Sequence, residues 1–207
     1  MTIHYLTLGY DCSPAAALRG LNLREFALPF DWVVSDVTIL ERCFKDNFSK
    51  FHTNLKFNSS KKRLIDAYGF EFPHDYPLSN SIVDIDTIGE GVFGEENGKA
   101  ISDNWINYYD DVLAKYNRRI ERFKNIINDQ NPIIVLCKYN TNDVLKLQNF
   151  FSTYYKKDNV YFINSTKEIF ETDKIKNINT EQNNVYNDKN VWKQCVDKII
   201  LNIQTQK

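Results

Sequence analysis

Glycine and proline are scarce, with seven and five copies in 207 residues. Collagen-like and elastic repeats need far more of both residues and are excluded. Charge of one sign is also missing, because 26 basic and 27 acidic residues leave a formal charge of -1. No broad positive field attracts nucleic acid or an anionic lipid surface. We therefore expect neither nucleic acid nor a membrane as a partner.

Long apolar runs are missing as well. No stretch approaches about 18 consecutive apolar residues, so no segment is expected to span a bilayer. The opening MTIHYLTLGYDC has no basic leader, and polar residues and a glycine break its apolar stretch. This is unlike a secretory signal peptide. The sequence therefore predicts a cytoplasmic protein.

The four cysteines lie far apart and form no C-x-x-C pair. This spacing argues against a zinc knuckle and against a disulfide-stapled miniprotein. Cys43, Cys137 and Cys195 lie beside or within apolar patterns, so we expect them in the core. Cys12 differs, because it follows a glycine turn. We expect no metal and no cofactor.

Hydrophobic residues make up 43% of the chain and aromatic residues 14%, which is enough for a substantial core. Short uninterrupted apolar strands, IIVLC and VYFIN, alternate with helical patterns. This alternation is typical of a parallel sheet covered on both faces. We predict a single α/β domain over residues 1–207, with a mainly parallel sheet, helices on both faces and an irregular β-containing excursion in the middle.

The first strand and helix frame Cys12. HYLTLGY is rich in strand formers and stops at Gly9. Ser13 and Pro14 then open a helix, because proline is tolerated in the first helical turn. In α/β proteins, the turn that joins a strand to the following helix is a common place for catalytic and ligand-binding residues.

Apolar residues at helical spacing predict four further helices. We expect them at Ser35 to Phe51, Ser102 to Asn128, Thr141 to Tyr154 and Trp192 to Ile203. From Thr53 to Ile101, turn residues surround short β-like runs such as SIVDIDTI, which predicts a hairpin or two. The polar, Asn-rich stretch 174–190 carries no strand or helix pattern of its own.

Cys12 is the sharpest candidate for chemistry. A thiol at a helix N-terminus lies near unpaired backbone N–H groups and the positive end of the helix dipole, and both stabilise a thiolate. The same N–H groups could hold an oxyanion. The alternative is a small cysteine that fills space below a glycine turn. Position alone favours the two equally.

A thiol nucleophile needs a base or an ion-pair partner, and histidine is the usual one. Among three histidines, His74 lies in the loop-like YGFEFPHDYP and leads, whereas His52 follows a predicted helix and is the reserve. Asp31 in PFDW is the preferred orienter of the imidazole. Asp75 adjoins His74, and adjacent side chains of an extended segment point to opposite sides. A loop histidine bonded to backbone and a turn-capping aspartate are the structural alternatives.

Arg118 and Arg119 lie on the predicted long helix, beside its apolar stripe. They fit a solvated helix face or a clamp for a carboxylate or phosphate, and the solvated face is the commoner of the two. Trp32 follows Asp31 and fits the core better than a substrate platform.

Four blocks of the sequence carry a resemblance, and they are TLGYDCSPAAALRGLNLREFALPFDW, YGFEFPHD, KYNRRIERF and PIIVLCKY. The chain resembles a domain of unknown function described as putative papain-like cysteine peptidases. Members show S-L-G-x-x-C-x-x-A-x-x-L-R, P-F-D-W, F-x-H-D and Y-x-R-R. The matches span roughly Leu6 to Tyr139. Thr7 and Lys138 stand where the family usually has Ser and Arg.

The resemblance implies Cys12 as nucleophile and His74 as its partner. With Asp31 as the third catalytic residue, the predicted supporting residues are Gly9, Trp32, Asp75, Arg118 and Arg119. We therefore expect a cysteine-dependent hydrolase that cleaves or transfers an acyl group from a peptide, isopeptide or thioester. Its partner would be a peptide or a small acyl substrate.

Two alternatives remain open beside the hydrolase. One is a glycan- or nucleotide-related transferase, in which the arginines bind phosphate and Cys12 is structural. The other is a catalytically silent binding module that keeps the fold. The reactivity of Cys12 against pH separates the hydrolase from both, since only a nucleophile needs a thiolate already formed near pH 6.

Overall fold

A computed structural model describes residues 2–60, 62–78, 100–185 and 188–205. The run SIVDIDTI lies outside these residues. The chain divides into two compact units, a first unit of residues 1–31 and 124–207 and a second unit of residues 32–123.

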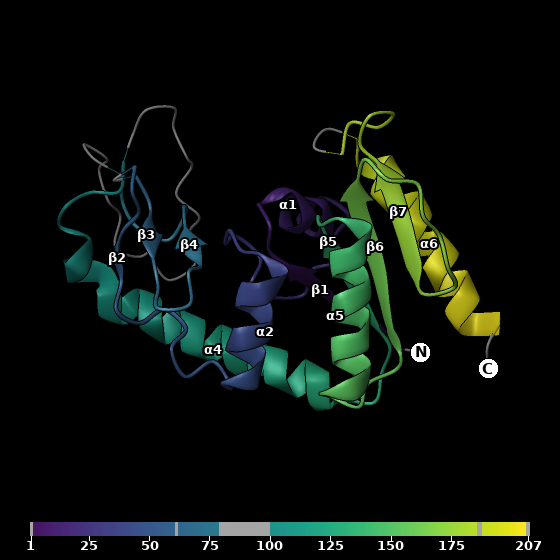
Figure 1. The fold of residues 1–207 in the computed structure, drawn as a ribbon, viewed down its shortest axis with the longest axis horizontal. Coiled ribbons are helices and arrows are strands. Elements are labelled where there is room, and N and C mark those ends of the chain that lie inside the picture. Colours follow the sequence, from purple (N-terminus) through teal and green to yellow (C-terminus); the bar gives the residue numbers. More distant parts are fainter. Residues whose placement is uncertain (1, 61, 79–99, 186–187, 206–207) are drawn as a thin grey trace. The chain divides into compact units, whose positions relative to one another are not determined.

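A four-stranded sheet forms the centre of the first unit (Figure 1). Its strands are β1 (His4–Leu8), β5 (Ile133–Cys137), β6 (Val160–Thr166) and β7 (Ile175–Asn179). They lie in the order β1-β5-β6-β7, and every neighbouring pair is parallel. All five residues of β5 are buried, because a central parallel strand is covered on both faces. The predicted parallel α/β sheet is confirmed.

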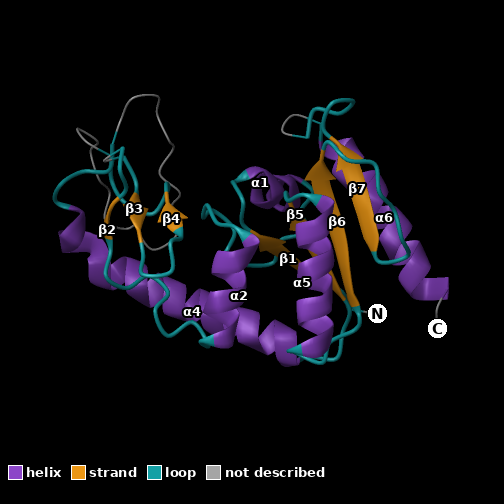
Figure 2. Ribbon diagram, in the orientation of Figure 1, coloured by secondary structure: helices purple, strands orange, loops and turns teal. Residues whose placement is uncertain are grey.

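Helices cover both faces of this sheet, as Figure 2 shows. On one face, α1 (Ser13–Gly20) and α6 (Lys189–Thr205) share a core with side chains of β5, β6 and β7. On the other face, α5 (Thr141–Thr153) places the Phe151 ring 6.1 Å from the ring of Phe162 on β6. Successive residues of a strand point to opposite faces. Phe162 therefore packs against α5, whereas its neighbours Tyr161 and Ile163 pack in the core shared with α1 and α6.

The second unit holds a small antiparallel sheet and an aromatic core. The sheet consists of β2 (Lys56–Phe57), β3 (Leu64–Ile65) and β4 (Glu71–Phe72), in that order. It confirms the predicted hairpins. The helices are α2 (Val37–Lys45), the short 3-10 helix η1 (Trp105–Tyr108) and α4 (Tyr109–Asn128), which ends in the first unit. The ring contacts of this core join Phe44, Phe48, Phe51, Phe70, Phe72, Tyr116 and Phe123.

Four helix boundaries differ from the prediction, and two of them belong to α2. α2 is capped by Asp36, whose side chain accepts a hydrogen bond from Ile39 N at 2.7 Å, and not by Ser35. α2 also ends at Lys45, because Asn47 and Phe48 adopt positive φ angles that no right-handed helix accepts. The phenylalanines that follow still pack inward, so their spacing imitated a longer helix.

The other two boundaries shift by a few residues. α5 is capped by Asn140 instead of Thr141, through a hydrogen bond from Asp143 N at 2.9 Å. The α-helical part of the long helix begins at Tyr109, since η1 occupies the turn before it. Within the described ranges, no helix combines the length and apolar character that a bilayer crossing requires.

Candidate functional site

The carboxyl edge of the parallel sheet is where the first unit gathers reactive side chains. β1 and β5 are neighbours, yet β1 leads into α1 on one face and β5 leads into α5 on the other. Connections that leave adjacent strands for opposite faces create a crevice at the carboxyl ends, where α/β proteins bind ligands. The turn between β1 and α1 lies at this carboxyl edge and carries Cys12.

Cys12 is the residue that precedes the first turn of α1. Its backbone is near-helical, its carbonyl accepts the hydrogen bond of Ala16 N at 3.0 Å, and its side chain caps no N–H group. The residue is half-buried. Its thiol thus lies at the positive end of a helix, which favours a thiolate.

Asp11 organises the turn around Cys12. Its Oδ1 accepts hydrogen bonds from Ser13 N at 2.9 Å and from Ser13 Oγ at 2.6 Å. Its Oδ2 lies 2.6 Å from the Nζ of Lys138, and Lys138 is the residue that follows β5. The same ammonium lies 5.5 Å from the centroid of the half-exposed Tyr10 ring. One lysine therefore holds the residues on the N-terminal side of Cys12.

The expected oxyanion site changes in composition. Ser13 N–H already donates to Asp11, and Pro14 has no N–H to offer. Neither of the first two residues of α1 thus offers a backbone N–H group to an oxyanion. The helix N-terminus still supplies a positive dipole at Cys12, but hydrogen bonds to a reacting carbonyl oxygen must come from other donors.

Asn164 is a site residue that the sequence reasoning missed. It is fully buried near the end of β6, and its side-chain amide pairs with both backbone groups of Tyr139, at 2.8 and 2.9 Å. Tyr139 in turn donates its hydroxyl to the carbonyl of Gly9. A buried amide needs such partners. Asn164 therefore fixes the chain beside Lys138 to the turn before Cys12, and a polar residue ending a buried strand was the available signal.

The other three cysteines divide into two groups. Cys43 and Cys137 are fully buried, and burial raises the pKa of both thiols. Their predicted place in the core is confirmed. Cys195 is half-buried at the edge of the core, so the prediction was too strong there, although burial raises the pKa of its thiol as well.

Asp31 is buried at the end of the first segment of the first unit. Its Oδ1 accepts the Thr7 hydroxyl at 2.8 Å, and its Oδ2 accepts Leu28 N at 2.9 Å. Arg24 Nη1 lies 3.7 Å from the same carboxylate. Asp31 thereby ties the PFDW turn to β1, and the hydroxyl at Thr7 serves this bond as a serine hydroxyl would.

His74 and Trp32 lie together in the second unit. Their rings meet edge to face with centroids 6.1 Å apart, and both residues are buried. Burial of Trp32 agrees with the core position expected for it. Since Cys12 belongs to the first unit, the pairing of Cys12 with His74 stays a prediction.

His52, the reserve histidine, is enclosed by aromatic rings. It has no exposed surface, its Nε2 lies 2.7 Å from the Tyr76 hydroxyl, and its ring stacks with those of Tyr76 and Tyr109. Burial lowers the pKa of His52 to about 3. An imidazole with this pKa is neutral at pH 7, which fits a structural role better than that of a cationic partner to a thiolate.

Asp75 belongs to a buried ionic cluster and not to the imidazole beside it in sequence. Its carboxylate lies 2.6 Å from Lys115 Nζ and accepts the Tyr116 hydroxyl at 2.7 Å. Burial favours the neutral acid, but the charges of Lys115 and Arg119 outweigh it and lower the pKa of Asp75 to about 2. Asp75 stays ionised at any physiological pH.

The two arginines of the long helix have different surroundings. Arg119 is 4% exposed, and its guanidinium lies 5.3 Å from the centroid of the Tyr116 ring. Arg118 is exposed, as a solvated helix face predicts. An arginine as buried as Arg119 fits the cohesion of the cluster better than a phosphate clamp open to solvent. In the described parts of the chain, no three His, Cys, Asp or Glu residues gather as metal ligands would.

Comparison with known proteins adds a family. An uncharacterised protein of Acanthamoeba polyphaga mimivirus is 23% identical over 154 residues, which cover 64% of this chain and 60% of that protein. No solved structure matches the chain. The model of a family described as putative papain-like cysteine peptidases matches residues 3–163. The match includes both Cys12 and His74, and the chain belongs to this family.

Proposed function

We propose that the protein is a cysteine-dependent hydrolase in which Cys12 is the nucleophile, His74 its proton partner and Asp31 a supporting residue. The observation that carries the proposal is the position of Cys12, at the N-terminus of α1 and at the switch point between β1 and β5. Family membership supports the same reaction class. The activity, the acyl substrate and the dyad all belong to this proposal.

The proposed reaction is acyl cleavage in two steps. The Cys12 thiolate attacks the carbonyl carbon of a peptide, isopeptide or thioester, and a C–S bond forms as the carbonyl oxygen becomes an oxyanion. Collapse breaks the bond to the leaving amine or thiol, which takes its proton from the His74 imidazolium. Water, deprotonated by the neutral imidazole, then attacks the thioester carbon. The C–S bond breaks, the carboxylic acid leaves, and the Cys12 thiolate and the His74 imidazolium are restored. Asp31 acts on this sequence through the position of the PFDW turn.

The alternative with a structural Cys12 gains no specific support. It relies on Arg118 and Arg119 to bind phosphate, whereas Arg119 is buried beside Asp75 and Lys115. The silent binding module has no observation in its favour either, and it becomes an outcome of the test below.

The test follows alkylation of Cys12 by iodoacetamide as a function of pH. If His74 is the proton partner, His74→Ala removes an imidazolium that favours the thiolate, so the midpoint of the pH–rate curve moves towards the free-thiol value of ~8.5. The shift is partial because the dipole of α1 remains. Asp31→Asn should move the midpoint less, in the same direction, since Asp31 acts on the thiolate only indirectly, through the position of the PFDW turn.

His52→Phe is the matched control, because it replaces the other buried histidine of the second unit with an aromatic ring. We expect it to leave the midpoint unchanged. A shift with His52→Phe and none with His74→Ala would assign the partner to His52. If neither variant moves the midpoint, Cys12 has no histidine partner and the dyad is wrong.

A further inference from the structure

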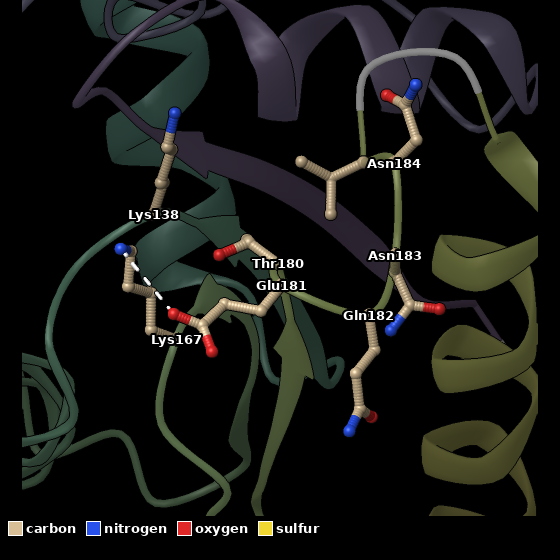
Figure 3. Close-up of a pocket in the computed structure, with 8 residues that line it drawn as sticks. Lys138, Lys167, Thr180, Glu181, Gln182, Asn183 and Asn184 are labelled. Carbon is tan, nitrogen blue, oxygen red and sulfur yellow. Dashed lines mark ion pairs between the residues drawn. The ribbon is translucent and has the colours of Figure 1, made fainter.

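A pocket lies at the carboxyl edge of the sheet, within the first unit. Its volume is about 590 Å³, within the range of ~300–1,000 Å³ of small-molecule sites. Figure 3 shows its side chains, which follow directly on three parallel strands. Lys138 follows β5, Lys167 follows β6, and the segment from Thr180 to Val185 follows β7. The pocket therefore lies at the same edge of the sheet as the turn that carries Cys12.

Lys138 connects this pocket to the turn of Cys12. It lines the pocket, and its Nζ lies 2.6 Å from Asp11 Oδ2, one residue before the thiol. Because β1 and β5 are neighbours, with Leu8 opposite Cys137, the residues after them emerge side by side. A substrate whose carbonyl reaches Cys12 can thus extend past Lys138 into the pocket.

The charges of the pocket indicate an uncharged ligand. Lys138 pairs with Asp11, and Lys167 lies 3.5 Å from Glu181 Oε1, the ion pair drawn in Figure 3. Two carboxylates thus balance the two ammonium groups, and the pocket has no excess of positive charge that would favour an anionic ligand. The remaining lining is uncharged, and it consists of Thr180, Gln182, Asn183, Asn184 and Val185.

Hydroxyl and amide side chains both donate and accept hydrogen bonds. An extended peptide backbone presents the same alternation of N–H and C=O groups, whereas Val185 offers an apolar contact for a side chain. We propose that this pocket binds the peptide segment next to the carbonyl that Cys12 attacks, and that Thr180 and Gln182 recognise its backbone. The proposal rests on the function proposed above and names its substrate class as an uncharged peptide.

The test compares two electrophiles that alkylate the same thiol. Iodoacetamide reports only the reactivity of Cys12, whereas N-acetyl-trialanine chloromethyl ketone also carries a peptide. In each reaction the thiolate forms a C–S bond and displaces a halide ion. The quantity measured is the second-order rate constant with the chloromethyl ketone divided by that with iodoacetamide. This ratio is normalised by the same ratio for glutathione. We expect this normalised ratio to be at least about ten in the wild type.

The variant Thr180→Val/Gln182→Ala should lower the ratio about tenfold, because two neutral hydrogen bonds together correspond to roughly one power of ten. Its rate with iodoacetamide should not change. Gln148→Ala/Asn149→Ala is the control, since these residues line a different pocket, on α5. It should leave both rates unchanged.

An unchanged ratio in Thr180→Val/Gln182→Ala overturns the pocket proposal and leaves the nucleophile intact. A third probe, N-iodoacetylglucosamine, carries a sugar instead of a peptide and tests for a glycan substrate. A higher normalised ratio for this probe than for the peptide probe overturns the peptide assignment. If iodoacetamide itself modifies Cys12 no faster than glutathione, the proposed function fails, and this proposal falls with it.

Discussion

Several buried ionisable residues of the second unit have shifted pKa values. His52 is kept neutral by burial, whereas Asp75 is kept ionised by Lys115 and Arg119. The Asp66 carboxylate accepts four hydrogen bonds, from the backbone N–H groups of His52, Tyr68, Gly69 and Phe70. Burial nevertheless raises the pKa of Asp66 to about 6. Groups with such shifts make stability depend on pH.

The burial of His52 predicts that acid destabilises the fold. The pKa of His52 is about 3 in the folded protein and about 6.5 in an unfolded chain. Between these values the unfolded state binds more protons, so the free energy of unfolding decreases as the pH falls from 6.5 towards 3. The slope approaches 1.4 kcal/mol per pH unit, and we expect a loss of roughly 2 kcal/mol by pH 5.

Urea melts at pH 7 and pH 5 measure this effect, with His52→Phe as the comparison. The variant keeps an aromatic ring between Tyr76 and Tyr109 but cannot titrate. Asp66 has the opposite effect, since its raised pKa adds stability as the pH falls through about 6. It does so in both proteins, so the difference isolates His52. Equal pH dependence in the two proteins would show that folding does not lower the pKa of His52.

At the scale of elements, the apolar stripe of α4 is the clearest case. The sequence predicts a long helix with one buried face, and Tyr116 in this stripe has no exposed surface. Its ring contacts Phe51 and Phe72, and its hydroxyl donates to Asp75. Tyr116 therefore joins the aromatic core to the ionic cluster.

Two substitutions separate these contributions of Tyr116. Tyr116→Ala should destabilise the protein by roughly 3–5 kcal/mol, as truncation of a buried aromatic does. Tyr116→Phe keeps the ring and leaves Asp75 with one donor fewer, which should cost roughly 1–3 kcal/mol. Denaturant melts give both values. A loss below about 1 kcal/mol for Tyr116→Ala would mean that the stripe does not face the core.

Most elements could be predicted from the sequence, because apolar periodicity reflects burial. The termini of helices could not, since neighbouring capping residues compete: Asp36 beside Ser35, and Asn140 beside Thr141. β7 was missed for another reason. Its sequence IKNIN is half polar, because it lies at the sheet edge and uses Asn177 to bond the side chains of Asn164 and Thr141. Its pattern matches neither an alternating nor a continuously apolar strand.

At the scale of the whole molecule, the position of Cys12 at a helix start could be predicted from the sequence but its surroundings could not, and its role as nucleophile stays a prediction. Cys12 was recognisable from a strand, a glycine and a proline-containing helix start. That Lys138 and Asn164 meet at the turn of Cys12 could not be predicted, because the order of the strands decides which loop ends meet. Once β5 lies beside β1, polar residues that follow the strands converge at one edge. The organisation of residues 1–207 as a single domain stays a prediction.

The central claim is that Cys12 is the nucleophile, and brief labelling of the native protein tests it most directly. With limiting iodoacetamide near pH 6, followed by identification of the modified residue, we expect the label on Cys12, and Cys12→Ser should remain folded and unlabelled. Burial raises the pKa of the thiols of Cys43, Cys137 and Cys195, so they should react slowly. Labelling of Cys12 no faster than in the unfolded chain, or preferential labelling of Cys195, would contradict the claim.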